Sequence, residues 1–183
     1  SGRELLAKQL ALVVSLAMVV LVVVMALQFD AGSDAAFQFV ESHVWIEQFG
    51  ISYALGVDGI ALVLIAMAVV LVPIVILAGW SDADDNERHR VQTYFALLLA
   101  LESAIVFVFA ATDLILFYVA FEVMLFPVYF LIGYFGGAQR TYAAVKFLLY
   151  SLFGGLLLLA ALIGLYVVSV RDLGQGTFDL ATL

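Results

Sequence analysis

The feature that most constrains this chain is a series of five long apolar segments. About twenty consecutive apolar residues are needed to span the hydrocarbon core of a bilayer. The chain has 183 residues, of which 66% are hydrophobic and only 12% are charged, so it is far more apolar than a water-soluble domain. We therefore predict an all-α, polytopic transmembrane helical bundle that forms a single membrane domain over residues 1–183. The five predicted spans are residues 5–27, 57–80, 91–111, 114–134 and 142–170.

The cations outside the membrane predict the orientation of the chain, because Lys and Arg near span ends mark the cytoplasmic side. The long polar connection, residues 28–56, contains acids but neither Lys nor Arg. We expect the first residue to be cytoplasmic and residues 28–56 to lie outside the cell. Arg171 is the one cation on the predicted outer side. The cations on the predicted cytoplasmic side are Arg3, Lys8, Arg88, Arg90 and Arg140.

Several classes of function are excluded by composition. The chain has no cysteine, so it cannot itself hold an iron–sulfur cluster through thiolates. Its two histidines, His43 and His89, fall in polar connections, which excludes a bis-histidine haem within the apolar segments. The sequence shows no metal-ligand spacing, no nucleotide fingerprint and no basic patch for nucleic acid. We expect no cofactor and no metal on this chain, and the lipid bilayer as its surroundings.

Three ionisable residues interrupt the apolar spans: Glu102, Glu122 and Lys146. A charge at the bilayer centre costs at least about 2.5 kcal/mol, so such residues face the interior of a bundle or a water-filled cavity. Counted from Asp113 at about 1.5 Å per residue, Glu102 and Glu122 lie roughly 14 to 16 Å deep, near mid-membrane. Lys146 lies about 8 Å inside the opposite edge, so a stretched side chain or water can bridge it to Glu122.

A Glu and a Lys on adjoining membrane helices suggest a proton relay. At about 4 Å and an effective dielectric constant of about 20 the two charges attract by roughly 4 kcal/mol. Moving one charge against 100 mV costs about 2.3 kcal/mol, so making and breaking such a pair is of the right size to load and unload a proton. The alternative is that Glu122 and Lys146 form a static buried pair that sets helix register. We take Glu122 and Lys146 as proton-transfer candidates and Glu102 as a further candidate.

The remaining features predict local structure. Asp58 and Asp113 stand at span starts, where a carboxylate caps a helix N-terminus. The stretch before Gly56 alternates in polarity and predicts an extended segment leading into the second helix. Pro127 predicts a kink near Glu122. Two pairs of small residues at helix-packing spacing predict close helix contacts rather than chemistry: Ser151 with Gly155, and Ala160 with Gly164.

Three stretches of the sequence resemble a known family. They are YALGVDGIALVL, DLILFYVAFEVMLFPVYFLIGYFGG and RTYAAVKFLLYSLFGGLLLLAALIGLY. They resemble the antiporter-like membrane subunits of proton-pumping NADH:quinone oxidoreductase, respiratory complex I, and most closely those of the subunit M type. The resemblance runs from about residue 50 to 170. Gly155 stands where these subunits frequently have Ser.

The resemblance implies a part of a larger fold of about fourteen helices. It implies that Glu122 is the membrane glutamate essential to the family and that Lys146 matches a lysine on the following helix. It also implies a bacterial inner-membrane protein whose partners are other membrane subunits of complex I. Flavin mononucleotide (FMN), iron–sulfur clusters and quinone would belong to partner subunits. The chain would then carry protons as a subunit of an oxidoreductase, without a redox centre of its own.

Two other functions remain open at this point. The first is a multisubunit sodium/proton antiporter, whose large subunits share this fold and the same acid. The second is a scaffold that docks neighbouring membrane subunits without transport, with Glu122 and Lys146 serving as a structural pair.

Overall fold

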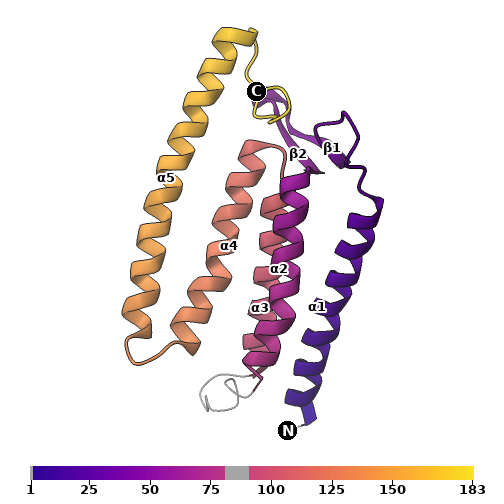
Figure 1. Cartoon of the computed structure of the whole chain (residues 1–183). Helices are drawn as coiled ribbons and strands as arrows, with labels where there is room; N and C mark the ends of the chain where they lie inside the picture. Colours follow the sequence, from indigo (N-terminus) through magenta and orange to yellow (C-terminus); the bar gives the residue numbers. More distant parts are fainter. Residues whose placement is uncertain (1, 81–90) are drawn as a thin grey trace.

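The computed structural model describes residues 2–80 and 91–183. Five helices run side by side, and each is long and apolar enough to cross a membrane (Figure 1). The prediction of an all-α transmembrane bundle with five spans is confirmed. The helices are α1 Gly2–Gln28, α2 Gly59–Ala78, α3 Val91–Ala110, α4 Leu114–Phe135 and α5 Arg140–Leu173.

The connections are divided between two ends of the bundle. The N-terminus and the turn between α4 and α5 lie at one end, which we call the N-terminal end (Figure 1). Two strands and the C-terminal segment lie at the other, which we call the hairpin end. Arg140 begins α5 and Arg171 lies in its last turn, so the two lie at opposite ends of the bundle, as expected. Arg88 and Arg90, which also entered the orientation argument, lie outside the described residues.

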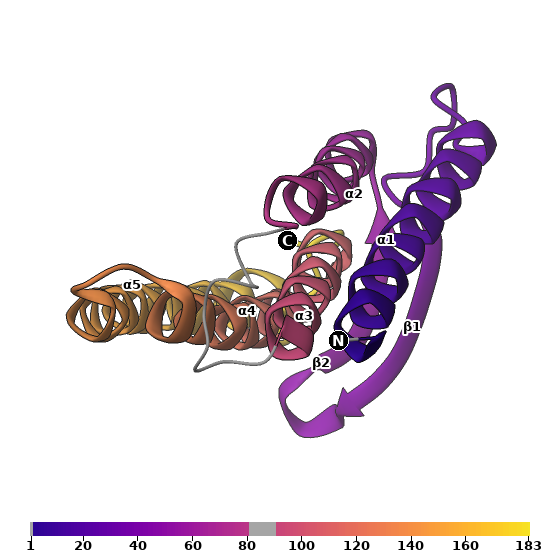
Figure 2. The same cartoon turned by 90° about the horizontal axis from the view of Figure 1, so that it is seen from below.

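Helix α3 is central in the bundle. It packs against α1, α2 and α4, while α5 packs against the outer side of α4 (Figure 2). Two buried apolar clusters hold α1, α2 and α3 together, one centred on Phe95 and the other on Ile65 and Val69. Because α4 and α5 lead away from these clusters, much of the surface of α5 has no neighbour within the described residues.

A β-hairpin covers the hairpin end. Strand β1 Gln38–Ile46 pairs antiparallel with β2 Ile51–Val57, and the short 3₁₀ helix Glu47–Phe49 connects them. The extended segment predicted before the second helix is therefore confirmed as β2. Helix α2 begins at Gly59, two residues later than predicted, because Val57 still pairs in the strand.

Gly50, at the turn of the hairpin, is a position where only glycine fits. Its φ is +62°, and a Cβ there would lie 2.8 Å from the carbonyl oxygen of Gly176. A left-handed conformation costs other residues roughly 1–2 kcal/mol, before any clash is counted. We expect Gly50→Ala to lower the thermal unfolding midpoint of the full-length protein in detergent. Gly59→Ala is the matched control, since a Cβ there meets nothing within 4 Å; equal midpoints would contradict this expectation.

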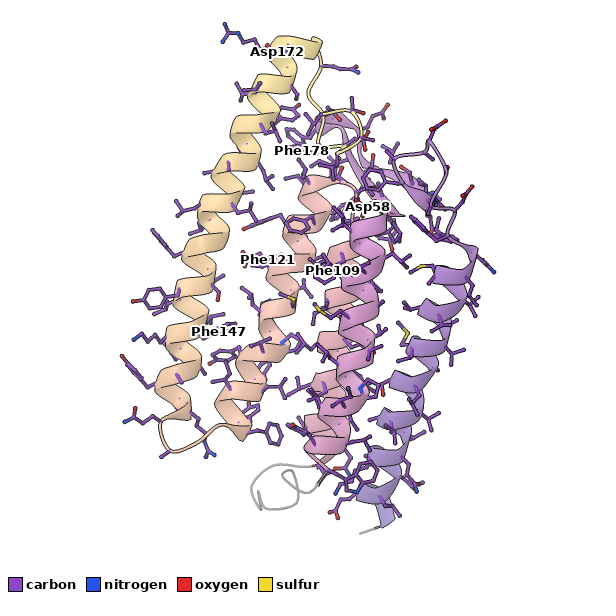
Figure 3. The ribbon with its side chains drawn as sticks, viewed as in Figure 1. Asp58, Phe109, Phe121, Phe147, Asp172 and Phe178 are labelled. Carbon is purple, nitrogen blue, oxygen red and sulfur yellow. The ribbon has the colours of Figure 1, made fainter. Side chains whose placement is uncertain are left out.

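Both aspartates predicted to cap helices do so. Asp58 Oδ1 accepts a hydrogen bond from the amide of Ala61 at 2.7 Å, at the hairpin end of α2 (Figure 3). Asp113 Oδ1 accepts from the amides of Ile115 and Leu116 at 2.9 and 3.0 Å. Each carboxylate satisfies donors that the first turn of a helix leaves unpaired.

Asp113 also joins α4 to the hairpin. Its Oδ2 accepts a hydrogen bond from the amide of Ser52 at 2.9 Å. The chain after α5 folds back onto the same place, where the backbone of residues 112–114 bonds with Phe178 and Leu180. The α3–α4 turn, β2 and the C-terminal segment are thus tied into one layer at the hairpin end.

The return of the C-terminal segment begins at Gly174, whose φ of +78° ends α5. The ring of Phe178 then stacks on Tyr166 of α5, with 4.8 Å between ring centroids, at the hairpin end (Figure 3). Phe178 is buried with Ile51 of β2 and Leu162 of α5. This cluster holds the hairpin-end half of α5 near α4, where Glu122 lies.

Candidate functional site

Glu122 lies in the hairpin-end half of α4, next to Phe121 (Figure 3). Its carboxyl group points at α5 and rests on the backbone of Gly155, so closely that a Cβ on Gly155 would overlap Oε1 and lie 3.0 Å from Cδ. Oε1 is buried and has no hydrogen-bond partner among the described residues. The acid is therefore half-buried, with Oε1 enclosed against α5 and without a bond to a cation or a donor of the described chain. Helix α4 continues through the buried Pro127 to Phe135.

Glu102 lies on α3 and is the more deeply buried of the two glutamates, with 2% of its surface exposed. Its Oε1 also has no hydrogen-bond partner among the described residues. Helices α3 and α4 are adjacent and antiparallel, and they meet at Thr112 and Asp113. At about 1.5 Å per residue, Glu102 and Glu122 lie roughly 16 and 14 Å from that turn. The structure thus puts two carboxyl groups at similar depth on neighbouring helices.

Lys146 does not contact Glu122 in the structure. Its side chain is exposed on α5, and its Nζ lies 5.6 Å from the ring centroid of Tyr142 and 5.9 Å from that of Tyr150. Lys146 precedes Gly155 by nine residues, which is two and a half helical turns and a rise of about 13 Å. The half turn puts Lys146 on the side of α5 opposite to the glycine that touches Glu122.

This geometry predicts that Glu122 and Lys146 contribute independently to stability. Changes at groups without a shared contact usually add within about 0.5 kcal/mol. We expect a double-mutant cycle of Glu122→Gln and Lys146→Gln, followed by unfolding in detergent, to show no coupling beyond that. A cycle of Tyr142→Leu with Lys146→Gln is the positive control, because those side chains are in contact. A clear coupling between Glu122 and Lys146 would show that they meet in the full-length protein.

The sequence did not identify Lys8 or Gly155 as candidate functional residues. Lys8, used only as an orientation cation, is 5% exposed, and its Nζ donates to the carbonyl of Trp80 at 2.6 Å. Gly155, expected only to pack, contacts the Glu122 carboxyl. The signal for Lys8 was its place within an apolar run. For Gly155 the available signal was the small-residue spacing, which does not reveal what the glycine touches.

The second pair of small residues that was predicted to make close helix contacts makes none among the described residues. Ala160 and Gly164 are exposed, and a Cβ on Gly164 would meet nothing within 4 Å. Within residues 2–80 and 91–183, no group of three His, Asp or Glu side chains is placed to hold a metal ion. What the described site offers chemically is two carboxyl groups that can exchange protons, one buried at Glu102 and one half-buried at Glu122.

Comparison with known families agrees with the sequence motifs. Residues 5–108 match the family described as "NADH-ubiquinone oxidoreductase chain 4, amino terminus". Residues 111–176, which include Glu122, Lys146 and Gly155, match the family described as "NADH:quinone oxidoreductase/Mrp antiporter, TM". The chain belongs to the NADH-ubiquinone oxidoreductase chain 4 family. The predicted resemblance to the antiporter-like subunits of complex I is therefore confirmed, and the chain is a multi-pass membrane protein of this family.

Two curated relatives are named subunit M, the subunit type that the sequence motifs resemble. The chain is 48% identical to NADH-quinone oxidoreductase subunit M of Mycobacterium tuberculosis, over 97% of this chain and 36% of that protein. It is 34% identical to F(420)H(2) dehydrogenase subunit M of Methanosarcina mazei, over 86% of this chain and 31% of that protein. The chain thus spans about a third of the length of these relatives.

Solved structures share the fold. Respiratory complex I from Thermus thermophilus contains a chain that matches with a TM-score of 0.70 and 25% identity, over 95% of this chain and 32% of that one. The Mrp complex from Dietzia sp. matches in fold with a TM-score of 0.64 and 22% identity, over 94% of this chain and 18% of that one. The five helices therefore form part of the antiporter-like fold.

Proposed function

We propose that this chain is the amino-terminal part of a proton-translocating subunit of complex I. The observation that carries the proposal is Glu122, a carboxyl group inside α4 whose Oε1 is buried without a hydrogen-bond partner in the described chain. It lies in the region that matches the oxidoreductase and antiporter family. NADH oxidation and quinone reduction take place in partner subunits, which hold the FMN, the iron–sulfur clusters and the quinone site. Other membrane subunits of complex I are its partners.

In this proposal Glu122 takes up and releases a proton as a cationic group approaches and withdraws. Lys146 faces away from Glu122 and reaches its carboxyl group only through a rearrangement of α5, so we assign the cation to a segment outside this chain. Lys146, between its two tyrosines, belongs to proton transfer nearer the N-terminal end. Glu102 is the second acid, on the neighbouring helix at similar depth. The roles of Glu102 and Glu122 are supported by their depth and by the burial of their Oε1 atoms, and that of Lys146 by its position on α5.

We also propose an orientation in the bacterial inner membrane. The N-terminal end of the bundle, with Lys8 and Arg140, faces the cytoplasm, and the hairpin end faces outward. This is supported by the excess of Lys and Arg at the N-terminal end and by their absence from residues 28–56.

A sodium/proton antiporter subunit is the second candidate, favoured by the fold shared with the Mrp complex. A scaffold that docks neighbouring subunits is the third candidate. It required Glu122 and Lys146 to form a structural pair, and the described contacts of these two residues contain no such pair. The relative named for F(420)H(2) indicates that proteins this similar serve different electron donors.

The test is purification of the full-length protein from its native membrane in mild detergent, followed by an assay of NADH:quinone oxidoreduction. Co-purified flavin and iron–sulfur protein together with NADH oxidation would support the complex I proposal. An assembly without NADH activity that moves protons in vesicles in response to a sodium gradient would replace it with the antiporter.

A further inference from the structure

Helix α5 buries one narrow face, against α4 and, near its end, against the C-terminal segment. The buried positions Ala144, Gly155, Leu162 and Ser169 follow one another at intervals of eleven, seven and seven residues. These intervals are close to whole numbers of helical turns, so the four positions share a face. Gly155 is the only glycine among them, and it is the one that lies at Glu122. The adjacent Gly154 is exposed, and a Cβ there would meet nothing within 4 Å.

The Glu122 carboxyl group occupies the space that a side chain at position 155 would need. A Cβ on Gly155 would overlap Oε1, while Cδ would be 3.0 Å and Oε2 3.7 Å away. Separations below 3.0 Å are essentially not found for real Cβ atoms, so a side chain at 155 displaces the Glu122 carboxyl group, which is the end of a flexible side chain and yields more easily than the backbone of α5. Two neighbouring glycines on α5 thus differ completely in what they touch.

We infer that Gly155 is a positioning residue for Glu122 in this chain, whose carboxyl group is seated against α5 because position 155 lacks the Ser side chain that subunits of this type frequently have there. This inference rests on the proposed role of Glu122 in proton transfer. In the seat, Oε1 is shielded by backbone and bound to no other side chain of the described residues. A proton-exchanging group that arrives at α4 therefore meets an acid in a fixed place, with no existing hydrogen bond to break.

The test compares Gly155→Ala with Gly154→Ala in the full-length protein within its native membrane complex. Both changes replace a helical glycine by alanine, so they share the gain in helix propensity. They differ in burial and in the overlap with Glu122. We expect Gly154→Ala to pump protons as the wild type does. We expect Gly155→Ala to pump roughly tenfold less or worse, since a misplacement of 1 Å at a reacting group can cost about 100-fold.

Rescue separates a displaced acid from a damaged fold. Glu122→Asp shortens the side chain by one methylene and withdraws the carboxyl group from position 155. In the Gly155→Ala background we expect this second change to restore part of the lost pumping, although Glu122→Asp alone lowers it. If the double variant is no better than Gly155→Ala while both complexes assemble normally, the inference is wrong.

A measurement independent of pumping tests the seat itself. An apolar carbodiimide labels membrane carboxyl groups, and mass spectrometry of the labelled peptide reports the rate at Glu122. We expect Gly155→Ala to raise that rate several-fold and Gly154→Ala to leave it unchanged. Equal rates in the two variants would overturn the inference. Full pumping by Glu122→Gln would instead overturn the proposed function, and the labelling contrast would still decide whether Gly155 seats the acid.

Discussion

Replacing Glu122 with Gln is expected to abolish proton pumping while the complex still assembles. Glutamine keeps the shape of the side chain and its fit against Gly155, but it cannot take up or release a proton in the working range of pH. A positioned acid or base contributes about 100-fold or more to a proton-transfer step. We therefore expect the pumping rate in vesicles to fall by at least about 100-fold. Pumping is read from a pH-sensitive dye after NADH addition.

The matched control is Glu41→Gln, the same chemical change on the exposed strand β1. It should pump normally, because a solvated carboxylate on the hairpin has no part in transfer through the bundle. Full pumping by Glu122→Gln would refute the proton-transfer role. A Glu122→Gln complex that assembles and conducts protons would favour the scaffold function.

The largest effect on stability is expected from Asp113→Ala. Asp113 is 1% exposed and accepts three backbone hydrogen bonds, two from α4 and one from Ser52. Its removal leaves one buried and two partly buried amides without partners and removes the side-chain bond between the α4 N-terminus and the hairpin. Loss of a helix cap costs about 1 kcal/mol, and buried unpaired donors add to it, so we expect a loss of about 3 kcal/mol. The loss is measured as a lower unfolding midpoint of the full-length protein in detergent.

Asp58→Ala is the comparison, because Asp58 is partly exposed and caps α2 through one hydrogen bond to Ala61. Its loss should be about 1 kcal/mol. Equal losses for the two variants would mean that the bond between Asp113 and Ser52 contributes nothing. Asp113→Asn should fall between them, since one amide oxygen can still accept from α4 while the amide nitrogen cannot accept from Ser52.

The sequence by itself determined the spans, the caps and the depth of the charged groups. A helix rises by a constant amount per residue, so counting from Asp113 was enough to place Glu102 and Glu122 at similar depth. Asp58 and Asp113 were recognisable because capping depends on the first helical turn alone. The extended segment β2 was also local, since alternation of side chains along a strand is visible in the sequence.

The rotation of each helix about its axis was decided only by the tertiary structure. In a soluble helix the apolar side shows which face is buried, but these helices are apolar all round. Depth arithmetic therefore suggested that Lys146 and Glu122 could meet, whereas packing puts Lys146 on the far side of α5 and Gly155 against the acid. The burial of Lys8 against Trp80 and the return of Phe178 onto α5 have the same origin. Contacts between distant segments depend on how the helices turn toward one another, and a uniformly apolar surface carries no sign of that choice.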